Sequence, residues 1–404
     1  MDDRKCIVCG NEEFIPLMTL DNMPSAVQHM PDKDDLKNDK PLRLDLCQCK
    51  KCGLVQFMVD PVYYYKDVIR AGGGTTTMRA LRHDEYKRLL HTMREKEISG
   101  RRIVEVGCGK GEFLGMWSDL EDEDVSKLDL MGIEHSDDLV KIGQSNGLNV
   151  IKGFAEGNFT YSTEKFDAFV QFNFLEHQPQ PADMLRNIWM NLNDQALGLI
   201  TVPSFEYIIE NDGYYELMRD HIAYYTIDTL SGLCENNGFH VLNSRFVNRD
   251  TIELIVEKTT MREDWNYLKD FPEIDVSNLK ENYKEISQVI QKHVSELDAE
   301  GKKMAIWGAS HQTFTLAATT DLKDKVSYII DSADFKQGKY SQASHLPIVS
   351  PDYFFDNPVN EILIVAPGYT DEIAGIINNR YGEKVRILVL KDKSIKDYLT
   401  NEVI

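Results

Sequence analysis

Short apolar runs alternate with amphipathic, helix-like stretches over most of the chain beyond residue 101. Runs of about four to eight apolar residues have the length of buried strands. Between residues 101 and 258 they occupy seven ranges: 103–107, 128–134, 150–155, 166–173, 196–203, 239–247 and 251–257. The last two are close enough in sequence to pair as a hairpin. This alternation predicts an α/β domain whose doubly wound sheet carries an antiparallel hairpin at one edge.

A second alternating block follows a long, mostly polar helix predicted over about 276–300. The helix has an apolar stripe, typical of a surface that packs on a neighbouring element. The strands expected beyond it are 303–310, 326–331, 361–368 and 385–390. This block predicts a smaller Rossmann-like domain. Its first turn, residues 308–312, lacks the repeated glycines of a dinucleotide site, so no second cofactor is expected there.

The first strand of the larger block ends in a glycine-rich turn that begins a helix. The turn contains Gly107, Gly109 and Gly111, which allow a ligand to approach the backbone closely. Glu105 lies just before them, where a carboxylate would repel a pyrophosphate and attract a cationic amino group. These residues favour S-adenosylmethionine over a dinucleotide. Cys108, inside the turn, has no base placed beside it and is interpreted as a small packing residue.

Acidic and polar residues end the next three strands. Glu134 closes the second strand about 20 residues after the glycines, where a carboxylate can hold the hydroxyls of a ribose. The third strand closes at Ala155 and Glu156, and Asn173 ends the fourth. We expect these residues to complete the cofactor site.

Four of the seven cysteines form two pairs with the spacing of zinc knuckles. The pairs are Cys6 with Cys9 and Cys49 with Cys52, each followed by a glycine suited to a tight turn. Four thiolates in this pattern predict a structural zinc site, with no position left for catalysis. Cys47 leaves the ligand choice partly open, because Cys47 and Cys49 offer a competing spacing.

The composition restricts the class of partner. A formal net charge of −21 argues against binding to a nucleic-acid backbone, and 42% apolar with 27% charged residues is typical of a soluble globular protein. No apolar run approaches membrane-spanning length, and the N-terminus lacks the pattern of a signal peptide. We therefore expect a cytoplasmic protein with a small-molecule substrate. The sequence does not distinguish a monomer from a dimer.

Four regions are predicted along the chain. A zinc-binding lobe covers 1–62, a bridging segment and helix 63–100, the larger α/β core 101–275, and the helix with the second block 276–404. The bridging segment contains a triple glycine at 72–74, as expected of a lid. Arg70 lies beside it as a possible contact for an anion.

The order of these parts resembles the zinc-containing nucleotide-sugar C-methyltransferases. The resemblance covers nearly the whole chain and is most specific in the last domain, at residues 336–339 (Lys-Gln-Gly-Lys) and 345–348 (His-Leu-Pro-Ile). It implies a zinc-binding lobe, a class I S-adenosylmethionine-dependent methyltransferase core and a C-terminal Rossmann-like substrate domain. That family methylates a carbon next to the ketone of a nucleotide-linked deoxysugar.

The resemblance also implies a set of acceptor contacts, which the chain keeps only in part. The family has a Glu-His pair after the fourth strand, matched here at Glu176 and His177, and a Tyr-His-Glu-His motif further on, where this chain reads Met218-Arg-Asp-His221. The last histidine is retained, the glutamate is shortened to Asp220 and the tyrosine is lost. The residues expected to contact the acceptor are Tyr65, Arg70, Tyr224, Ser310, His311, Lys336 and Lys339.

Methylation of carbon requires an enolate, and therefore a base with a pKa near neutrality. His221 with Asp220 is favoured as this base, and His177 is the alternative or else polarises the carbonyl. Two other functions stay open. One is an O- or N-methyltransferase acting on a sugar or another polar metabolite, suggested by the lost tyrosine. The other is a non-catalytic binding protein that has kept the fold.

Overall fold

The computed structural model describes residues 4–67, 76–261, 271–366, 368–391 and 394–404. The chain divides into two compact units. The first unit comprises Met1–Ile15, Cys47–Phe205 and Ile222–Glu273, and the second comprises Pro16–Leu46, Glu206–His221 and Ile274–Ile404. Within the described ranges no helix has both the length and the apolar character needed to cross a bilayer.

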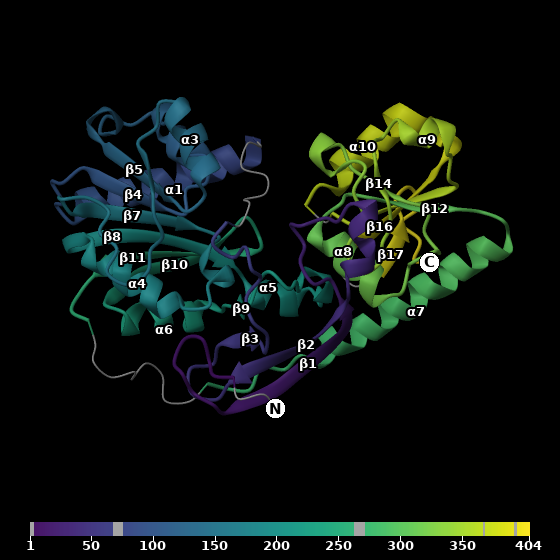
Figure 1. The fold of residues 1–404 in the computed structure, drawn as a ribbon, viewed down its shortest axis with the longest axis horizontal. Helices are drawn as coiled ribbons and strands as arrows, with labels where there is room; N and C mark the ends of the chain where they lie inside the picture. Colours follow the sequence, from purple (N-terminus) through teal and green to yellow (C-terminus); the bar gives the residue numbers. More distant parts are fainter. Residues whose placement is uncertain (1–3, 68–75, 262–270, 367, 392–393) are drawn as a thin grey trace. The chain divides into compact units, whose positions relative to one another are not determined.

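The first unit contains the predicted sheet, with strands in the order β10-β11-β8-β7-β4-β5-β6 (Figure 1). The strands are β4 (Arg102–Val106), β5 (Asp129–Glu134), β6 (Val150–Lys152), β7 (Phe166–Phe172), β8 (Leu192–Pro203), β10 (Phe239–Val247) and β11 (Thr251–Lys258). The strands from β6 to β8 are parallel, whereas β11 is antiparallel to both β8 and β10. The predicted hairpin at one edge is therefore confirmed. The sheet order reverses beside β4, so the strand that carries the glycine turn lies at the switch point where ligands bind in such folds.

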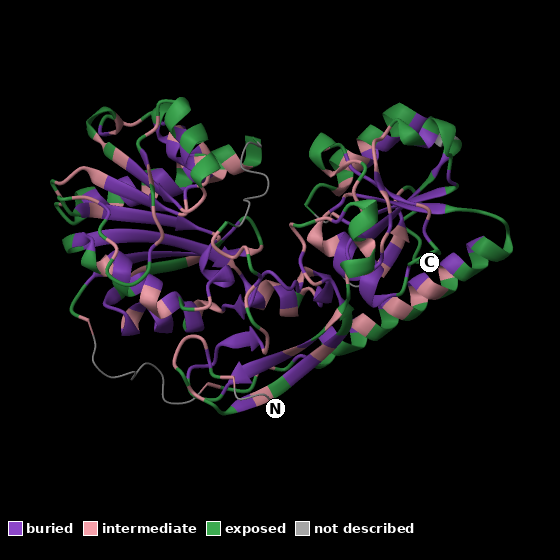
Figure 2. Cartoon of the chain, in the orientation of Figure 1, coloured by how far each residue is buried: buried purple, intermediate pink, exposed green. Residues whose placement is uncertain are grey.

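Helices cover both faces of this sheet. They are α1 (Thr76–Glu95), α2 (Glu112–Met116), α3 (Asp137–Ser145), α4 (Pro181–Met190) and α6 (Ile227–Asn236). Val104 and Val106 pack with apolar residues of α4 and α6, while Ile103 packs with α1 and α2. Figure 2 shows the central strands almost entirely buried, which explains why they read as continuous apolar runs.

The second unit contains a six-stranded sheet in the order β14-β13-β12-β15-β16-β17. Its strands are β12 (Met304–Trp307), β13 (Ile329–Ile330), β14 (Ile348–Val349), β15 (Glu361–Ile364), β16 (Arg386–Lys391) and β17 (Ser394–Asp397). Its helices are α7 (Ser277–Ala299), α8 (His311–Thr319), α9 (Tyr353–Asp356) and α10 (Thr370–Tyr381), with most of α5 (Phe205–Glu210). Only β17 is antiparallel to its neighbour. The Rossmann-like character predicted for this block is confirmed.

A four-stranded sheet not predicted from the sequence is built mainly from the N-terminal region. It contains β1 (Phe14–Met23), β2 (Leu42–Cys49), β3 (Val55–Phe57) and β9 (Ala223–Tyr224) in that order. β1 and β2 each start in one unit and end in the other, which makes them a continuous covalent connection between the two. The polar loop between them includes one short 3₁₀ turn, Lys33–Asn38.

Candidate functional site

The glycine turn after β4 has the backbone conformation that its composition predicts. Gly107, Gly109 and Gly111 have φ angles of +73°, +59° and +83°, in the left-handed region that disfavours other residues. A methyl group added at Gly109 would meet no atom within 4 Å, whereas one at Gly107 would lie 3.0 Å from the ring of Phe174. The turn therefore leaves room for a ligand beside the backbone of Gly109.

Glu134 ends β5 with its carboxylate fixed by two backbone donors. Gly109 donates its N–H to Oε2 (2.9 Å) and Ser136 donates to Oε1 (2.8 Å). The side chain is only 6% exposed, and burial raises the pKa of its carboxyl against the opposing effect of these donors. Each carboxylate oxygen has a second lone pair, so the group can also accept hydrogen bonds from the hydroxyls of a ribose.

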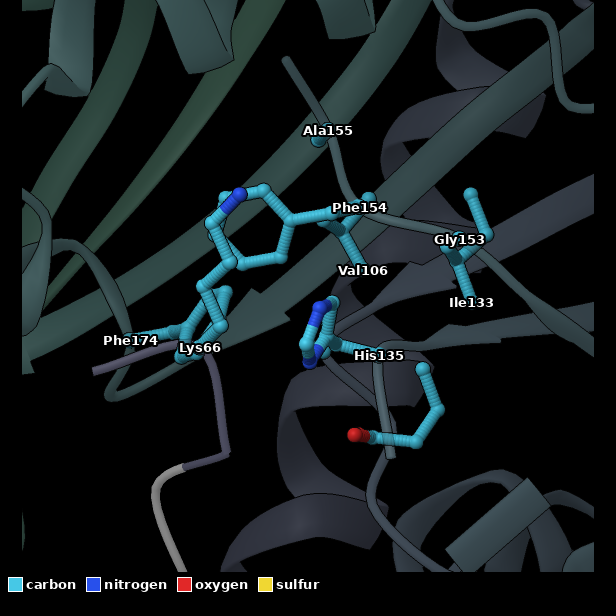
Figure 3. A pocket seen from close by; sticks show the side chains of 10 residues that line it. Lys66, Val106, Ile133, His135, Gly153, Phe154, Ala155 and Phe174 are labelled. Carbon is cyan, nitrogen blue, oxygen red and sulfur yellow. The ribbon is translucent and has the colours of Figure 1, made fainter. Parts of the chain in front are cut away.

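A hollow of about 210 Å³ lies beside Glu134. Figure 3 shows the side chains of His135, Phe154 and Phe174 around it. Its walls come from the ends of β4, β5, β6 and β7, and they include Gly107, His135, Phe154 and Phe174. Lys66, from the bridging segment, also lines this hollow. The hollow thus lies at the carboxyl edge of the parallel strands, where the sequence predicted the cofactor.

A second hollow of about 320 Å³ shares Phe154 and Ala155 with the first. Its other walls include Tyr65, Glu156, Gln178 and Asp183. The structure thereby brings Glu134, Ala155 and Glu156, three of the residues predicted to bind the cofactor, to two adjoining hollows. It also places Tyr65, expected at the acceptor, at the second hollow.

The remaining cofactor candidates lie in or at the end of the sheet. Glu105 is fully buried in β4, in register with Gly132 of β5. Asn173 follows β7 with a φ of +48°, and the hydroxyl of Thr201 donates to its Oδ1 (2.8 Å). This bond fixes the asparagine side chain at the same edge of the sheet as the glycine turn.

The Glu-His pair forms a buried 3₁₀ turn, Leu175–His177, directly after β7. Glu176 and His177 are 2% and 5% exposed, and Oε1 of the former is 3.9 Å from Nε2 of the latter. Ile222 donates its N–H to the carbonyl of Glu176 (3.0 Å). Because His221 is bonded to Ile222, the chain itself brings the second candidate histidine to this turn.

Asp220 and Tyr224 take part in internal packing. The Oδ2 of Asp220 accepts the N–H of Val27 (3.0 Å) within the second unit. Tyr224 is 3% exposed in β9, and its ring packs against those of Phe57 and Phe205. Arg70, with the triple glycine, lies outside the described residues.

Both cysteine pairs have the geometry of zinc knuckles. Gly10 donates to the carbonyl of Cys6 and Gly53 to that of Cys49, each at 2.9 Å, and both glycines have a positive φ. The ligand atoms of Cys6, Cys9, Cys49 and Cys52 all lie within 4.8 Å of one another.

The thiol spacing fits a tetrahedral metal. Two sulfur–sulfur distances, Cys6 to Cys52 and Cys9 to Cys49, are 3.5 Å. Four sulfurs at about 2.3 Å from a zinc ion would be about 3.8 Å apart. The residues present therefore fit zinc.

In the second unit, an aspartate after β13 repeats the arrangement of Glu134. Asp331 accepts the N–H of Ala309 at Oδ2 (2.8 Å) and that of Ala333 at Oδ1 (2.9 Å). Here, however, Lys336 donates through Nζ to the same Oδ2 (3.1 Å) and to the carbonyl of Ala309 (2.9 Å). The carboxylate is thus paired with a cation of its own domain.

The other acceptor candidates of the second unit also have internal partners. Ser310 caps α8 by accepting the N–H of Thr313 (3.3 Å). The Nε2 of His311 lies 3.1 Å from Glu216, and Nζ of Lys339 lies 2.7 Å from Asp32. Ser310 and His311 thus lie at the start of α8, whereas Lys336 and Lys339 lie in the segment after β13.

Several residues at the two hollows were not predicted from the sequence: Lys66, His135, Phe154, Phe174 and Gln178. Three of them follow the end of a strand by one or two residues, a position that could have been used to find them. Lys66 gives no such signal, because it reaches the pocket from a segment far from the core in sequence.

Comparison with known proteins is consistent with this architecture. Residues 78–244 match the model of a methyltransferase domain, and residues 240–389 match that of the C-methyltransferase C-terminal domain. The C-methyltransferase NovU of Streptomyces niveus is 22% identical over 393 residues, which cover 91% of each chain.

Solved methyltransferase structures are similar over less than half of the chain. The plantazolicin methyltransferase BpumL, in complex with a desmethylPZN analog and SAH, is 14% identical, covers 46% of this chain and 87% of its own, and has a TM-score of 0.37. Magnesium protoporphyrin IX methyltransferase of Synechocystis PCC 6803 is 12% identical, with coverages of 48% and 91% and a TM-score of 0.35.

The two matched ranges follow the order of the two Rossmann-like sheets, although the second match begins within β10 of the first sheet. The first carries the glycine turn, Glu134 and the adjoining hollows, and the second is the C-terminal domain that accompanies the core in C-methyltransferases. Residues 78–244 and 240–389 are therefore similar to a methyltransferase domain and to a C-methyltransferase C-terminal domain, and the chain is an S-adenosylmethionine-dependent methyltransferase.

Proposed function

We propose that this enzyme methylates a carbon next to the ketone of a nucleotide-linked sugar, with a histidine as the base. The observation that carries the proposal is the buried Glu176–His177 turn, to which the chain also joins His221 through Ile222. The C-terminal domain of C-methyltransferases supports transfer to carbon. S-adenosylmethionine supplies a methyl group on a positively charged sulfur.

The chain's own residues would prepare the acceptor. A buried imidazole removes the proton next to the ketone more readily than an exposed one, because water does not compete for it. His221 is the favoured base. His177 then donates a hydrogen bond to the carbonyl oxygen, and Oε1 of Glu176 lies 3.9 Å from its Nε2.

Exchange of hydrogen with deuterated solvent tests the base directly. In the absence of methyl transfer, the enzyme should exchange the acidic hydrogen of a keto-sugar nucleotide, detected by mass spectrometry. His221→Asn should lower both exchange and turnover by about 100-fold, because a general base contributes about that much. His240→Asn, at an exposed histidine paired with Glu235, is the matched control and should change neither.

The outcomes separate the candidate reactions. If His177→Asn abolishes exchange and His221→Asn does not, His177 is the base and His221 is the residue that contacts the carbonyl. Methylation without any exchange would contradict carbon transfer and indicate an oxygen or nitrogen acceptor. Mass spectrometry of the products from a panel of nucleotide-sugars identifies the acceptor, and failure of every member would reject the sugar class.

The same proposal includes one structural zinc ion held by the four knuckle cysteines. Protein purified without added metal should contain about one zinc per chain, and Cys49→Ser should lose it. Cys47→Ser is the control, because Cys47 is buried in β2 but is not part of the four-thiol group. Less than half an equivalent of zinc in the wild type, or loss of zinc in the control, would contradict this ligand set.

A further inference from the structure

Three consecutive residues of the bridging segment, here called the strap (residues 65–67), each contact a wall of the two hollows. The ring of Tyr65 packs edge-on against that of Phe154, with centroids 6.2 Å apart. Lys66 lies with Nζ 2.8 Å from the carboxylate of Glu156. Asp67 binds Nδ1 of His135 at 2.8 Å. The strap therefore joins the ends of two neighbouring strands over the cofactor site.

The two hollows can take the two halves of a nucleoside, the ribose in the first and the base in the second. Glu134 faces the first hollow and suits the ribose. The second hollow, on the other side of the Phe154 ring, presents the carboxylates of Glu156 and Asp183 and the amide of Gln178. Asp183 already accepts the N–H of Gly157 (3.0 Å), which fixes it in the wall. A carboxylate at this point favours a base with an amino group, such as adenine, over one with a carbonyl.

Lys66 already binds the carboxylate that such an amino group would need. Its ammonium forms the pair with Glu156 and also lies 4.5 Å from the centroid of the Phe154 ring. Lys66 lines the first hollow, and its ammonium thus lies between a carboxylate of the second hollow and the aromatic ring that both hollows share.

We propose that Lys66 is a latch on the cofactor site: it occupies Glu156 until the adenine amino group displaces it, and Glu156 then selects a 6-aminopurine. The inference rests on the adenosyl cofactor assigned above. The lysine and glutamate side chains are 24% and 53% exposed, so their pair is screened by water and opens at little cost. The latch therefore lowers affinity several-fold without preventing binding.

Calorimetry on the full chain with S-adenosylhomocysteine and S-inosylhomocysteine tests both parts. The wild type should prefer the adenosyl compound by about tenfold, because inosine has a carbonyl in place of the amino group. Glu156→Gln should reduce this preference, since an amide can pair with either base. Lys66→Met should bind S-adenosylhomocysteine about two- to fivefold more tightly, and Lys66→Arg should behave like the wild type.

A double mutant and a control isolate the latch from general effects. In the Glu156→Gln background, Lys66→Met should bring no further gain, because the pair is already broken. Lys96→Met removes a surface pair of equal length, 2.8 Å to Glu257, that lines neither hollow, and it should leave both affinities unchanged.

Each contrary result has its own meaning. Unchanged or weaker binding of S-adenosylhomocysteine by Lys66→Met rejects the latch. Equal binding of the two compounds by the wild type rejects selection by Glu156. If the wild type binds neither compound, the adenosyl cofactor itself is rejected, which separates failure of the function from failure of this inference.

Discussion

Glu134 and Asp331 hold equivalent positions in the two Rossmann-like sheets, and their surroundings differ at one point. Glu134 ends β5, the neighbour of β4, and Asp331 directly follows β13, the neighbour of β12. Each carboxylate accepts one backbone N–H from the turn after the first strand of its sheet and one from the residue two positions further along the chain. Asp331 is additionally paired with Lys336, five residues downstream, whereas Glu134 borders a hollow. The same backbone arrangement therefore borders a hollow in one sheet and holds an internal ion pair in the other.

The turns that face these two acids also differ in the room that they leave for a ligand. The turn before Glu134 contains three glycines with positive φ, while the turn before Asp331 contains only Gly308 within residues 308–312, with a φ of +103°. A single such glycine turns the chain but gives less room for a ligand to reach the backbone. The expectation that no second cofactor binds at this turn stays a prediction, and Lys336 is the cation that pairs with Asp331 there.

The largest expected effect distinguishes the two carboxylates by cofactor binding. Glu134→Ala should weaken binding of S-adenosylmethionine by about 30- to 100-fold, because the ribose loses charge-assisted hydrogen bonds worth about 2–3 kcal/mol. Asp331→Ala should leave this affinity unchanged. Calorimetry with the full chain measures both. A large loss of affinity in Asp331→Ala, with none in Glu134→Ala, would show that the cofactor binds at Asp331 and not at Glu134.

A smaller effect should appear in stability when the brace is broken. Lys336→Met leaves the Asp331 carboxylate, 9% exposed, without its cation, which should cost about 1–2 kcal/mol and lower Tm by a few degrees. Lys339→Met is the control, because Lys339 and Asp32 are 34% and 61% exposed and such pairs contribute little.

Removing the charge of the acid should reverse part of the loss. In the Lys336→Met background, Asp331→Asn should recover some stability, because a neutral amide needs no cation, but its single oxygen can accept only one of the two backbone N–H groups. Unchanged stability of Lys336→Met would show that the pair is only a surface contact.

The smallest effect concerns pH. Burial raises the pKa of the Glu134 carboxyl above its ordinary value of 4.5. The ionised carboxylate therefore lowers the stability of the fold at neutral pH. This loss of stability is removed as the pH falls through the raised pKa. Ribose binding has the opposite dependence, because the protonated carboxyl loses an acceptor. Cofactor affinity should be flat near neutrality and fall by up to about tenfold per pH unit below the raised pKa. Glu134→Gln should abolish this dependence, and an unchanged slope would assign it to another group.

The succession of strands along the chain was predictable because buried parallel strands are continuous apolar runs, and Gly107 with Glu134 predicted the cofactor site at the edge where the first hollow lies. β1 and β2 were not predicted, since Pro16 and Asp21 interrupt the apolar pattern of the first and the pair is completed by residues distant in sequence.

The same limit applied to the site. Lys66 and Glu156 are 90 residues apart, so no spacing rule connects them. Lys336 follows Asp331 closely, but a lysine in a polar turn looks the same whether it binds a substrate or a neighbouring carboxylate.

The chain passes from one compact unit to the other five times, after Ile15, Leu46, Phe205, His221 and Glu273. Modular engineering of this enzyme is therefore constrained. The second unit of a relative cannot be attached at a single junction, because three separate segments belong to each unit. A chimera must exchange 16–46, 206–221 and 274–404 together. A protease cut at one boundary leaves the two units covalently joined at the other four crossings.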